Sequence, residues 1–346
     1  MLKYLRWFLL PFSWLYGSII LIRNWCYDAG IFKSQGFDIP VISVGNLDIG
    51  GAGKSPMTEY LVHLFKGYKK VATLSRGYGR NTQGFLIADA NSTATQIGDE
   101  PAQFKQKFPD ITVAVCEKRV NGINQLKGNH NLIILDDAYQ HRAVKAGLSI
   151  LLFDHSRIFE PRFILPAGNL REPFSGRKRA DIIIVSKCPS SLSLQEQQNI
   201  KSRIDPFSHQ TLFFSAISYG NLQDINADPV TTIIDAETVV FLITGIANPT
   251  PLLKHVKKQA KQVVHHNYPD HHQFSLKNIA KLADEFNACT TDKKLIITTE
   301  KDIQRLREHE LLPAVKQLPV LVMPIQVQFL AGGQEAFDKT LKNYVR

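Results

Sequence analysis

Short, almost wholly apolar runs recur along the chain from residue 38 onward, and stretches with helical periodicity separate them. Such runs are typical of strands buried on both faces of a parallel sheet, because neither face is left for alternating polar residues. In the first part of the chain, the predicted strands are residues 39–44, 70–75, 111–116, 131–136, 148–153 and 181–186. Helices are predicted between several of them, for example over residues 54–67 and 98–108. The alternation predicts an α/β protein with a mostly parallel sheet flanked by helices.

A polar, turn-rich segment at residues 219–236 interrupts this pattern and predicts a domain boundary. Beyond it, the predicted strands are residues 238–244, 294–299 and 319–325, and the predicted helices are residues 251–260 and 300–308. We therefore expect a core domain over residues 26–222 and a second, smaller α/β domain over residues 234–346.

The first 25 residues have a different pattern, with sixteen uncharged residues between Arg6 and Arg23. As a helix, this stretch would be about 24 Å long, which is short of the roughly 30 Å hydrocarbon core of a membrane. All three tryptophans of the chain lie here, at Trp7, Trp14 and Trp25. Because tryptophan favours the membrane–water interface, we predict a membrane-surface helix over residues 1–25, with Lys3, Arg6 and Arg23 near lipid headgroups. The alternative is a helix packed on the protein's own core.

Composition narrows the classes of partner. The chain has 44% hydrophobic residues and 21% charged residues, which is ordinary for a folded protein. The net charge of +10 favours anionic partners such as nucleotides, nucleic acid or an acidic membrane surface. Cys26, Cys116, Cys188 and Cys289 are far apart and form no C-x-x-C pair, so we expect free thiols rather than disulfides or a zinc knuckle.

The segment "GNLDIGGAGKSP" at residues 45–56 follows a predicted strand and precedes a predicted helix, which is the context of a phosphate-binding loop. Its glycines allow backbone amides to converge on phosphate oxygens. Lys54 would reach the β- and γ-phosphates, and Ser55 would offer a hydroxyl to Mg²⁺. The predicted nucleotide-binding residues of the loop are Gly50, Gly51, Ala52, Gly53, Lys54 and Ser55.

The loop departs from the strict pattern G-x-x-x-x-G-K-[ST], because Asp48 occupies the position of the first glycine. A double glycine before G-K also occurs in a branch of P-loop ATPases and GTPases, where a lysine often precedes the pair; here that residue is Ile49. A structural turn is therefore the alternative. Asp136 and Asp137 close a buried apolar strand, where such folds place the second Mg²⁺ anchor, and with Ser55 they are the predicted metal ligands.

Two further groups could take part in chemistry. In "IGDEP", Asp99 and Glu100 are either ordinary N-terminal residues of a helix or include a general base for an attacking hydroxyl. In "YPDHHQFS", His271 could tune a carboxylate. With its neighbours, His265 and His266 among them, it could alternatively belong to a metal site, although nothing in the sequence fixes the geometry of such a site.

Seven motifs together resemble the tetraacyldisaccharide 4′-kinase family, the lipid A pathway kinases of Gram-negative bacteria. They occur in the family's order over roughly residues 12 to 305 and read "VGNLDIGGAGKSP", "LSRGYGR", "GDEP", "LDDAYQHR", "LPAGNLREP", "DHHQF" and "TTEKD". The resemblance implies a P-loop NTPase-like fold of two α/β domains with the active site in the cleft between them.

The resemblance also implies a reaction. ATP, with Mg²⁺, would give its γ-phosphate to the 4′-hydroxyl of a tetraacyl glucosamine disaccharide 1-phosphate, forming lipid IV A. The expected partners are this lipid A disaccharide precursor and the membrane surface, with no nucleic acid and no protein partner. The expected location is the cytoplasmic face of the bacterial inner membrane, where the N-terminal helix holds the enzyme.

By motif, the resemblance makes Asp99 the base and His271 its partner, and it makes Lys54 catalytic. The residues matched to nucleotide binding outside the loop are Arg119, Gln140, His141, Arg171 and Glu172. The chain departs from the family at Asp48, where a threonine or similar small residue is usual, at Ala138, where glycine is usual, and at Asn169, where proline is common.

Two rivals from other classes stay open at this point. A P-loop switch or metal-delivery ATPase would hydrolyse nucleotide without the lipid and bind Zn²⁺ or Ni²⁺ tightly; the missing lysine at Ile49 counts against it. A non-catalytic membrane-surface binding protein would be indifferent to Lys54→Ala.

Overall fold

The computed structural model of the protein describes residues 6–346, and residues 1–5, including Lys3, lie outside the described part. Two compact units make up the chain, and each combines segments that are not contiguous in sequence. The first unit comprises residues up to 76, 116–217 and 327–346, and the second comprises 77–115 and 218–326.

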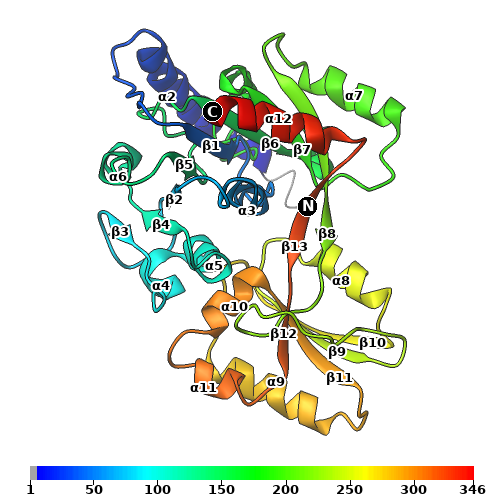
Figure 1. Cartoon of the computed structure of the whole chain (residues 1–346). Coiled ribbons are helices and arrows are strands. Elements are labelled where there is room, and N and C mark those ends of the chain that lie inside the picture. The colour runs from blue at the N-terminus through cyan, green and yellow to red at the C-terminus, as the bar shows by residue number, and fades with distance from the viewer. Residues whose placement is uncertain (1–5) are drawn as a thin grey trace. The chain divides into compact units, whose positions relative to one another are not determined.

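The first unit is built on a mostly parallel sheet with the strand order β13-β8-β7-β6-β1-β5-β2 (Figure 1). The strands are β1 (Val41–Asn46), β2 (Val71–Ser75), β5 (Leu132–Leu135), β6 (Leu148–Asp154), β7 (Ile182–Ser186), β8 (Thr211–Tyr219) and β13 (Ile325–Phe329). β1 pairs in parallel with β5 and β6, and β7 pairs in parallel with β6 and β8. Every residue of β1, β5 and β7 is buried, as parallel strands covered on both faces require. The carboxyl ends of β7, β6, β1 and β5 therefore meet at one edge, where open α/β sheets bind ligands.

Helices cover this sheet, and the C-terminal helix of the chain is one of them. They are α3 (Lys54–Phe65), α6 (Arg119–Leu126), α7 (Leu194–Ile204) and α12 (Gly333–Val345), with the short 3₁₀ helices η2 (His155–Arg157) and η3 (Phe174–Arg179). α3 packs against β1 and β5, and α6 packs against β2. Phe337 of α12 is fully buried against the ring of Phe213 on β8, at a centroid distance of 5.3 Å. This packing explains why the last residues of the chain belong to the first unit.

The second unit has a parallel sheet with the strand order β10-β9-β11-β12 and an antiparallel pair, β3–β4. Its strands are β3 (Leu86–Ile87), β4 (Thr112–Val115), β9 (Val239–Thr244), β10 (Gln262–Asn267), β11 (Lys294–Thr299) and β12 (Val320–Met323). Its helices are α4 (Ala94–Ile97), α5 (Asp99–Lys107), α8 (Thr250–Lys257), α9 (Leu276–Ala288), α10 (Glu300–Leu306) and α11 (Leu312–Val315).

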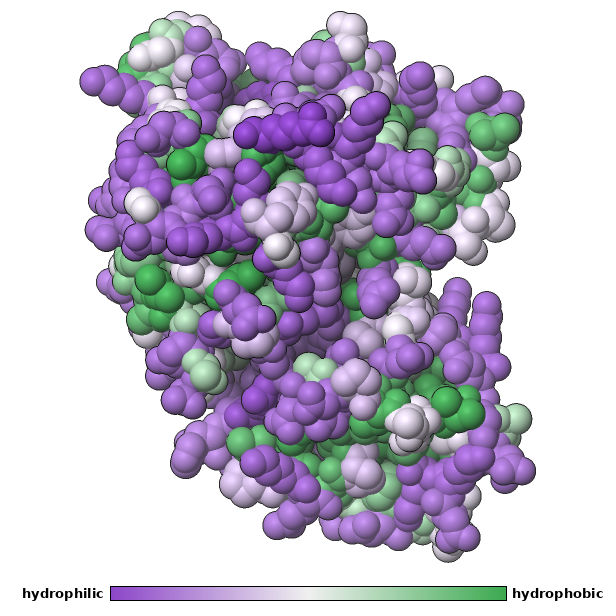
Figure 2. Space-filling view, viewed as in Figure 1, coloured by the Kyte–Doolittle hydropathy of each residue, from purple (hydrophilic) through white to green (hydrophobic). Residues whose placement is uncertain are grey.

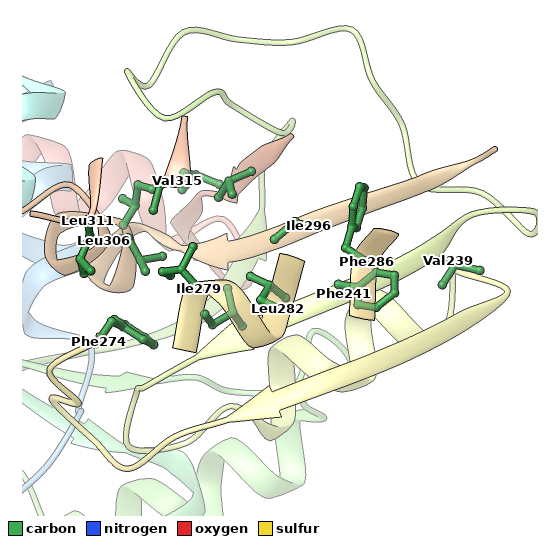
Figure 3. Packing of buried hydrophobic residues seen from close by; sticks show 14 residues of the cluster. Val239, Phe241, Phe274, Ile279, Leu282, Phe286, Ile296, Leu306, Leu311 and Val315 are labelled. Atoms are coloured by element: carbon green, nitrogen blue, oxygen red, sulfur yellow. The ribbon is translucent and has the colours of Figure 1, made fainter. Parts of the chain in front are cut away.

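Alternate residues of β9 serve two different cores, because successive side chains of a strand point to opposite faces. Phe241 belongs to the core shared with α9, where Ile279, Leu282 and Phe286 pack (Figure 3). Leu242, the next residue, belongs to the core that includes Leu252 and Val256 of α8. The parallel sheet of the second unit is therefore covered on both faces.

The N-terminal segment forms η1 (Arg6–Leu9) and α2 (Leu10–Asp28), and most of its apolar side chains are exposed. The exposed large apolar residues are Trp7, Phe8, Leu9, Phe12, Trp14, Leu15, Ile19, Leu21, Ile22 and Trp25. Only Ser13 and Gly17 of α2 are buried. Figure 2 shows hydrophobic atoms at the top left of the view, where the end of α2 and the segment after it lie in Figure 1. No helix among residues 6–346 is long and apolar enough to cross a membrane.

The side of this segment that faces the protein is polar and forms hydrogen bonds with the rest of the first unit. The Arg6 guanidinium donates to the carbonyl oxygen of Pro166 at 3.1 Å, and that of Arg23 donates to the carbonyl oxygen of Gln140 at 2.7 Å. Both arginines were predicted near lipid headgroups, which stays a prediction, and each donates to protein carbonyls. α2 is thus a helix with an exposed apolar side and a bonded polar side.

The predicted α/β class and mostly parallel sheet are confirmed, and the predicted strands agree with the structure to within about two residues, the reliability expected of element boundaries. Four strands, β3, β8, β10 and β13, were not predicted. The contacts also group the chain differently from the linear bounds 26–222 and 234–346, because residues 77–115 pack with the C-terminal half and residues 327–346 with the N-terminal half. As functional domains, those bounds stay a prediction.

Candidate active site

The segment between β1 and α3 turns at two glycines with left-handed backbone. Gly50 has φ 100° and Gly53 has φ 83°, a region that L side chains rarely adopt. Gly53 is the N-cap of α3, so Lys54 and Ser55 begin the first turn of the helix. The first-turn amides and the helix dipole attract anions. This segment, the phosphate loop, therefore has the backbone geometry that a phosphate needs.

Lys54 lies along the phosphate loop. Its Nζ donates to Asn46 Oδ1 at 3.1 Å and is 3.7 Å from Asp137 Oδ2. Arg171 NH1 donates to both oxygens of the same carboxylate, at 3.0 and 3.1 Å. Asp137 itself has a left-handed backbone, with φ 46°. The structure thus brings together three predicted site residues, a carboxylate and two cations, at the carboxyl ends of β1 and β5.

The other acidic residue of the pair, Asp136, is buried and accepts a hydrogen bond from Thr58 Oγ1 at 2.9 Å. Ser55 lies one turn before Thr58 on α3 and therefore on the same side of the helix. Mg²⁺ prefers oxygen ligands and usually combines one or two carboxylates with phosphate oxygens. The hydroxyl of Ser55 and the carboxylates of Asp136 and Asp137 fit that preference. Among residues 6–346, no three His, Cys, Asp or Glu side chains are grouped so that they could hold a metal ion.

Glu172 is the centre of a buried network in the first unit and is only 2% exposed. Arg179 NH2 donates to both of its carboxylate oxygens at 2.8 Å. Gln140 Nε2 donates to Glu172 Oε1 at 3.1 Å and to the Asn46 carbonyl at 2.8 Å. Asn24 of α2 donates to Glu172 Oε2 at 3.3 Å. The predicted residues Gln140 and Glu172 therefore link α2 to the start of the phosphate loop.

Burial lowers the pKa of two further predicted site residues in the first unit, Arg119 and His141. Arg119 is 4% exposed and donates to the carbonyls of Cys116 and Glu117. Burial and, to a smaller extent, the charge of Arg76 lower the pKa of Arg119 to about 10, which still leaves it charged at neutral pH. Burial and the charge of Arg119 lower the pKa of His141 to about 4, so its imidazole is neutral. A neutral ring near a buried guanidinium can accept or donate a hydrogen bond without adding charge.

In the second unit, the structure brings Asp99 and His271 together. His271 Nδ1 is 2.9 Å from Asp99 Oδ2, and Arg305 Nε is 3.2 Å from the same oxygen. The bond to Asp99 raises the pKa of His271, against a smaller opposing effect of burial. Both contacts place positive charge on one side of the carboxylate. Such an arrangement orients the carboxylate.

Uncommon backbone conformations at Gly98 and His271 hold the pair of Asp99 and His271 in place. Gly98, the N-cap of α5, has φ 96° and ψ 157°, and a Cβ there would lie 2.9 Å from the carbonyl oxygen of Tyr78. His271 has φ 56°, and its N–H donates to the Gly245 carbonyl at 3.0 Å. Asp99 thus begins α5 directly after a glycine that no other residue replaces without strain.

Arg305 and its partner Asp302 were not predicted as site residues, although Asp302 ends the quoted motif "TTEKD" and Arg305 follows it. Arg305 is 2% exposed, and its NH2 is 3.2 Å from Asp302 Oδ1. Asp302 Oδ2 accepts bonds from the Gly245 N–H at 3.0 Å and from Thr299 Oγ1 at 2.7 Å. The sequence shows Arg305 six residues after the N-capping Thr299, but the local sequence does not show that Arg305 contacts Asp99.

The alternative metal site at the histidines finds no support in the geometry. His265 and His266 are consecutive residues of β10, so their side chains point to opposite faces of the sheet. His265 Nε2 is 2.8 Å from Thr244 Oγ1, and His266 Nε2 is 3.2 Å from Glu285. Burial lowers the pKa of both rings.

Comparison with known proteins decides the family. The model of the family described as tetraacyldisaccharide-1-P 4′-kinase, LpxK, matches residues 5–346. The chain belongs to this family. A tetraacyldisaccharide 4′-kinase from Flavobacterium johnsoniae is 43% identical over 350 residues, covering 99% of this chain and 98% of the relative. One from Bacteroides thetaiotaomicron is 41% identical over 359 residues, covering 100% and 94%.

A solved structure of the family is also similar. The crystal structure of the "apo" form of LpxK from Aquifex aeolicus in complex with ATP has a TM-score of 0.76 to this chain. The two sequences are 29% identical, and the match covers 99% of this chain and 100% of the other. The P-loop kinase fold predicted for the chain is thus confirmed.

Two of the three departures from the usual tetraacyldisaccharide 4′-kinase motifs, Asp48 and Asn169, can now be placed in the first unit. Asp48 pairs its backbone with Leu170 in an isolated bridge, and its side chain lines a hollow with Arg157 and Glu160. Burial raises the pKa of Asp48 above its ordinary value. The carbonyl of Asn169 accepts from the Ile49 N–H at 2.8 Å. Asp48 and Asn169 thus both lie where residues 48–49 pair with residues 169–170, next to the phosphate loop.

Proposed function

We propose that the chain transfers the γ-phosphate of ATP to the 4′-hydroxyl of a tetraacyl glucosamine disaccharide 1-phosphate, forming lipid IV A. The observation that carries this proposal is the family match over residues 5–346. The relatives bear the name tetraacyldisaccharide 4′-kinase over nearly their full length, and the similar LpxK structure is a complex with ATP. Phosphoryl transfer needs positioning and charge neutralisation rather than covalent chemistry, and the described side chains supply both.

The phosphate loop would bind the triphosphate of ATP. The amides at the start of α3 would donate to phosphate oxygens, and Lys54 Nζ would leave Asn46 to neutralise the β- and γ-phosphates. Ser55, Asp136 and Asp137 would hold a Mg²⁺ ion, which supplies positive charge that neutralises the phosphates. Arg171 would keep the carboxylate of Asp137 oriented, since it already bonds both of its oxygens.

Asp99 would accept the proton of the attacking hydroxyl. His271 and Arg305 both contact Oδ2, so we assign Oδ1 as the oxygen that takes the proton. His271 would orient the carboxylate and offset part of its charge, because its raised pKa increases the share of the ring that is protonated at neutral pH. Arg305 would contact the same oxygen at any protonation state of His271.

The N-terminal segment would attach the enzyme to the cytoplasmic face of the inner membrane as a peripheral protein. Its exposed side is rich in aromatic and aliphatic side chains, including Trp7, Trp14 and Trp25. Tryptophan and aliphatic residues on one side of a helix favour binding in the headgroup region. This placement would put the catalytic residues near the water-facing sugar of a lipid whose acyl chains stay in the bilayer.

A transfer assay with γ-labelled ATP and purified lipid disaccharide tests the function. We expect label in the lipid, dependent on Mg²⁺ and lost on chelation with EDTA. A switch or metal-delivery ATPase would instead release labelled inorganic phosphate at an equal rate without the lipid. That result, with no label in the lipid, would overturn the proposal.

A further inference from the structure

The residues directly after β7 bind the phosphate loop from outside. Lys187 Nζ donates to the carbonyl oxygen of Gly51 and to Asp154 Oδ2, the latter at 2.9 Å. Asp154 is the last residue of β6. Lys187 has a left-handed backbone with φ 57°, which is costly for a residue with a side chain and is found preferentially at functional sites. The fold therefore maintains a strained lysine whose ammonium ends on the tip of the loop.

Two neighbouring side chains hold the loop in the same way. Ser186 Oγ donates to the Ala52 carbonyl at 2.7 Å, and Arg157 NH1 donates to the Ile49 carbonyl at 2.7 Å. In a planar trans peptide, the C=O and the following N–H point in opposite directions. Fixing the carbonyls of Ile49 and Ala52 outward therefore directs the N–H groups of Gly50 and Gly53 to the other side of the loop.

The Gly51 carbonyl belongs to the peptide at the tip of the loop. The N–H of that peptide, on Ala52, donates to the Gly50 carbonyl at 3.1 Å and so closes a tight turn. Lys187 fixes this turn from outside, whereas Lys54 contacts the loop from within, at the Gly50 carbonyl and Asn46. When Lys54 turns to a phosphate, the contact of Lys187 with the loop can remain.

We propose that Lys187, oriented by Asp154, is a positioning residue that holds the phosphate loop in its nucleotide-binding shape. A loop that is already in the bound shape loses less conformational freedom on binding and so binds more tightly. The side chain of Lys187 is partly exposed, and that of Asp154 is 14% exposed, so the carboxylate is the more buried member of the pair. Burial alone would raise the pKa of Asp154, but the charge and hydrogen bond of Lys187, together with hydrogen bonds from Ser156, outweigh it, and the pKa is lowered.

Lys187→Met tests this role because it removes the charge and nearly keeps the length of the side chain. We expect the dissociation constant for ATP to rise about tenfold to a hundredfold, the range for loss of a hydrogen bond from a charged group. Turnover at saturating ATP and the KM for the lipid should change little, by about threefold or less, because the loop is restored once nucleotide fills it. Lys187→Arg should recover most of the affinity. The matched control is Lys293→Met, which removes a lysine paired with Asp235 in the second unit and should leave ATP binding unchanged.

Lys187→Gly separates the charge from the backbone. Glycine adopts φ 57° without strain, so this variant relieves the conformational cost while losing the ammonium. If the ammonium positions the loop, Lys187→Gly binds ATP as weakly as Lys187→Met. If only the backbone shape matters, it binds ATP as well as the wild type does, and the proposal is wrong.

Because this role rests on the proposed function, the wild type is measured first, by calorimetric titration with ATP and Mg²⁺. A wild type that binds no ATP contradicts the proposed function itself. A wild type that binds ATP, together with a Lys187→Met variant whose affinity is within about twofold of it, contradicts only the positioning role. Should Lys187→Met not fold, Asp154→Asn leaves the lysine in place but unoriented, and unchanged ATP affinity in that variant equally overturns the proposal.

Discussion

Asp99→Asn removes one charge and the proposed proton acceptor from the pair that Asp99 forms with His271, and it keeps the shape of the side chain. The amide oxygen of the new side chain can occupy the position of Oδ2, where it can still bond His271 and contact Arg305 Nε. Arg305 also keeps Asp302 at 3.2 Å and the carbonyls of Gly245 and His272 at 3.2 and 3.0 Å. The fold should therefore survive, with a loss of about 1.5–3 kcal/mol, the range for weakening a hydrogen bond to a charged group.

The effect on catalysis should be much larger than that on stability. A general base contributes about 10²- to 10⁴-fold, so turnover of Asp99→Asn at saturating ATP and lipid should fall by at least about 10²-fold. The dissociation constant for ATP should stay within about twofold, because the phosphate loop lies in the other unit. Turnover is measured by γ-label transfer, ATP binding by calorimetry and stability by thermal unfolding.

The matched control is Asp235→Asn, which weakens an ion pair with Lys293 in the same unit but outside the site. We expect it to leave turnover unchanged. A folded Asp99→Asn variant that retains turnover within about tenfold of the wild type would refute the assignment of Asp99 as the base.

Three further outcomes are expected. Glu172→Ala leaves the partly buried Arg179 without its carboxylate and should lower the free energy of unfolding by about 3 kcal/mol, the lower end of the range for breaking a buried ion pair, measured by denaturant titration. The pKa of His271 is raised in the folded state, so its protonated ring stabilises the fold fully below the ordinary pKa of 6.5, and this stabilisation is lost as the pH rises through the raised value. The difference in unfolding free energy between the wild type and His271→Gln should therefore shrink over that rise in pH. Gly98→Ala places a Cβ against the Tyr78 carbonyl and should cost at least about 1 kcal/mol and lower turnover without weakening ATP binding.

Much of the fold could be predicted from sequence because its central strands are buried on both faces. Every residue of β1, β5 and β7 is buried, and each strand was predicted to within about two residues of its observed bounds. β10 was missed because it reads "QVVHHN" and is half-exposed at the edge of its sheet, so its pattern is not that of a buried strand. The discontinuous units could not be predicted, since they depend on contacts between distant segments.

Some residues of the candidate site could likewise be predicted from local sequence, and others depend on contacts between distant segments. Lys54 and Ser55 belong to a local loop motif, in which spacing alone indicates the chemistry. The partnership of Asp99 and His271 joins residues 172 positions apart, and only resemblance to a family suggested it. Lys187 contacts the phosphate loop across 136 positions. No local pattern marks such a contact, because it arises only when the carboxyl ends of neighbouring strands meet.

A crystal structure of the chain with Mg²⁺ and a non-hydrolysable ATP analogue tests the central claim most directly. We predict the β- and γ-phosphates within hydrogen-bond distance of the amides of residues 50–55, with Lys54 Nζ moved from Asn46 onto a phosphate oxygen and a Mg²⁺ ion between the phosphates and Asp136 or Asp137. A triphosphate bound elsewhere, with Lys54 still on Asn46, would contradict the account.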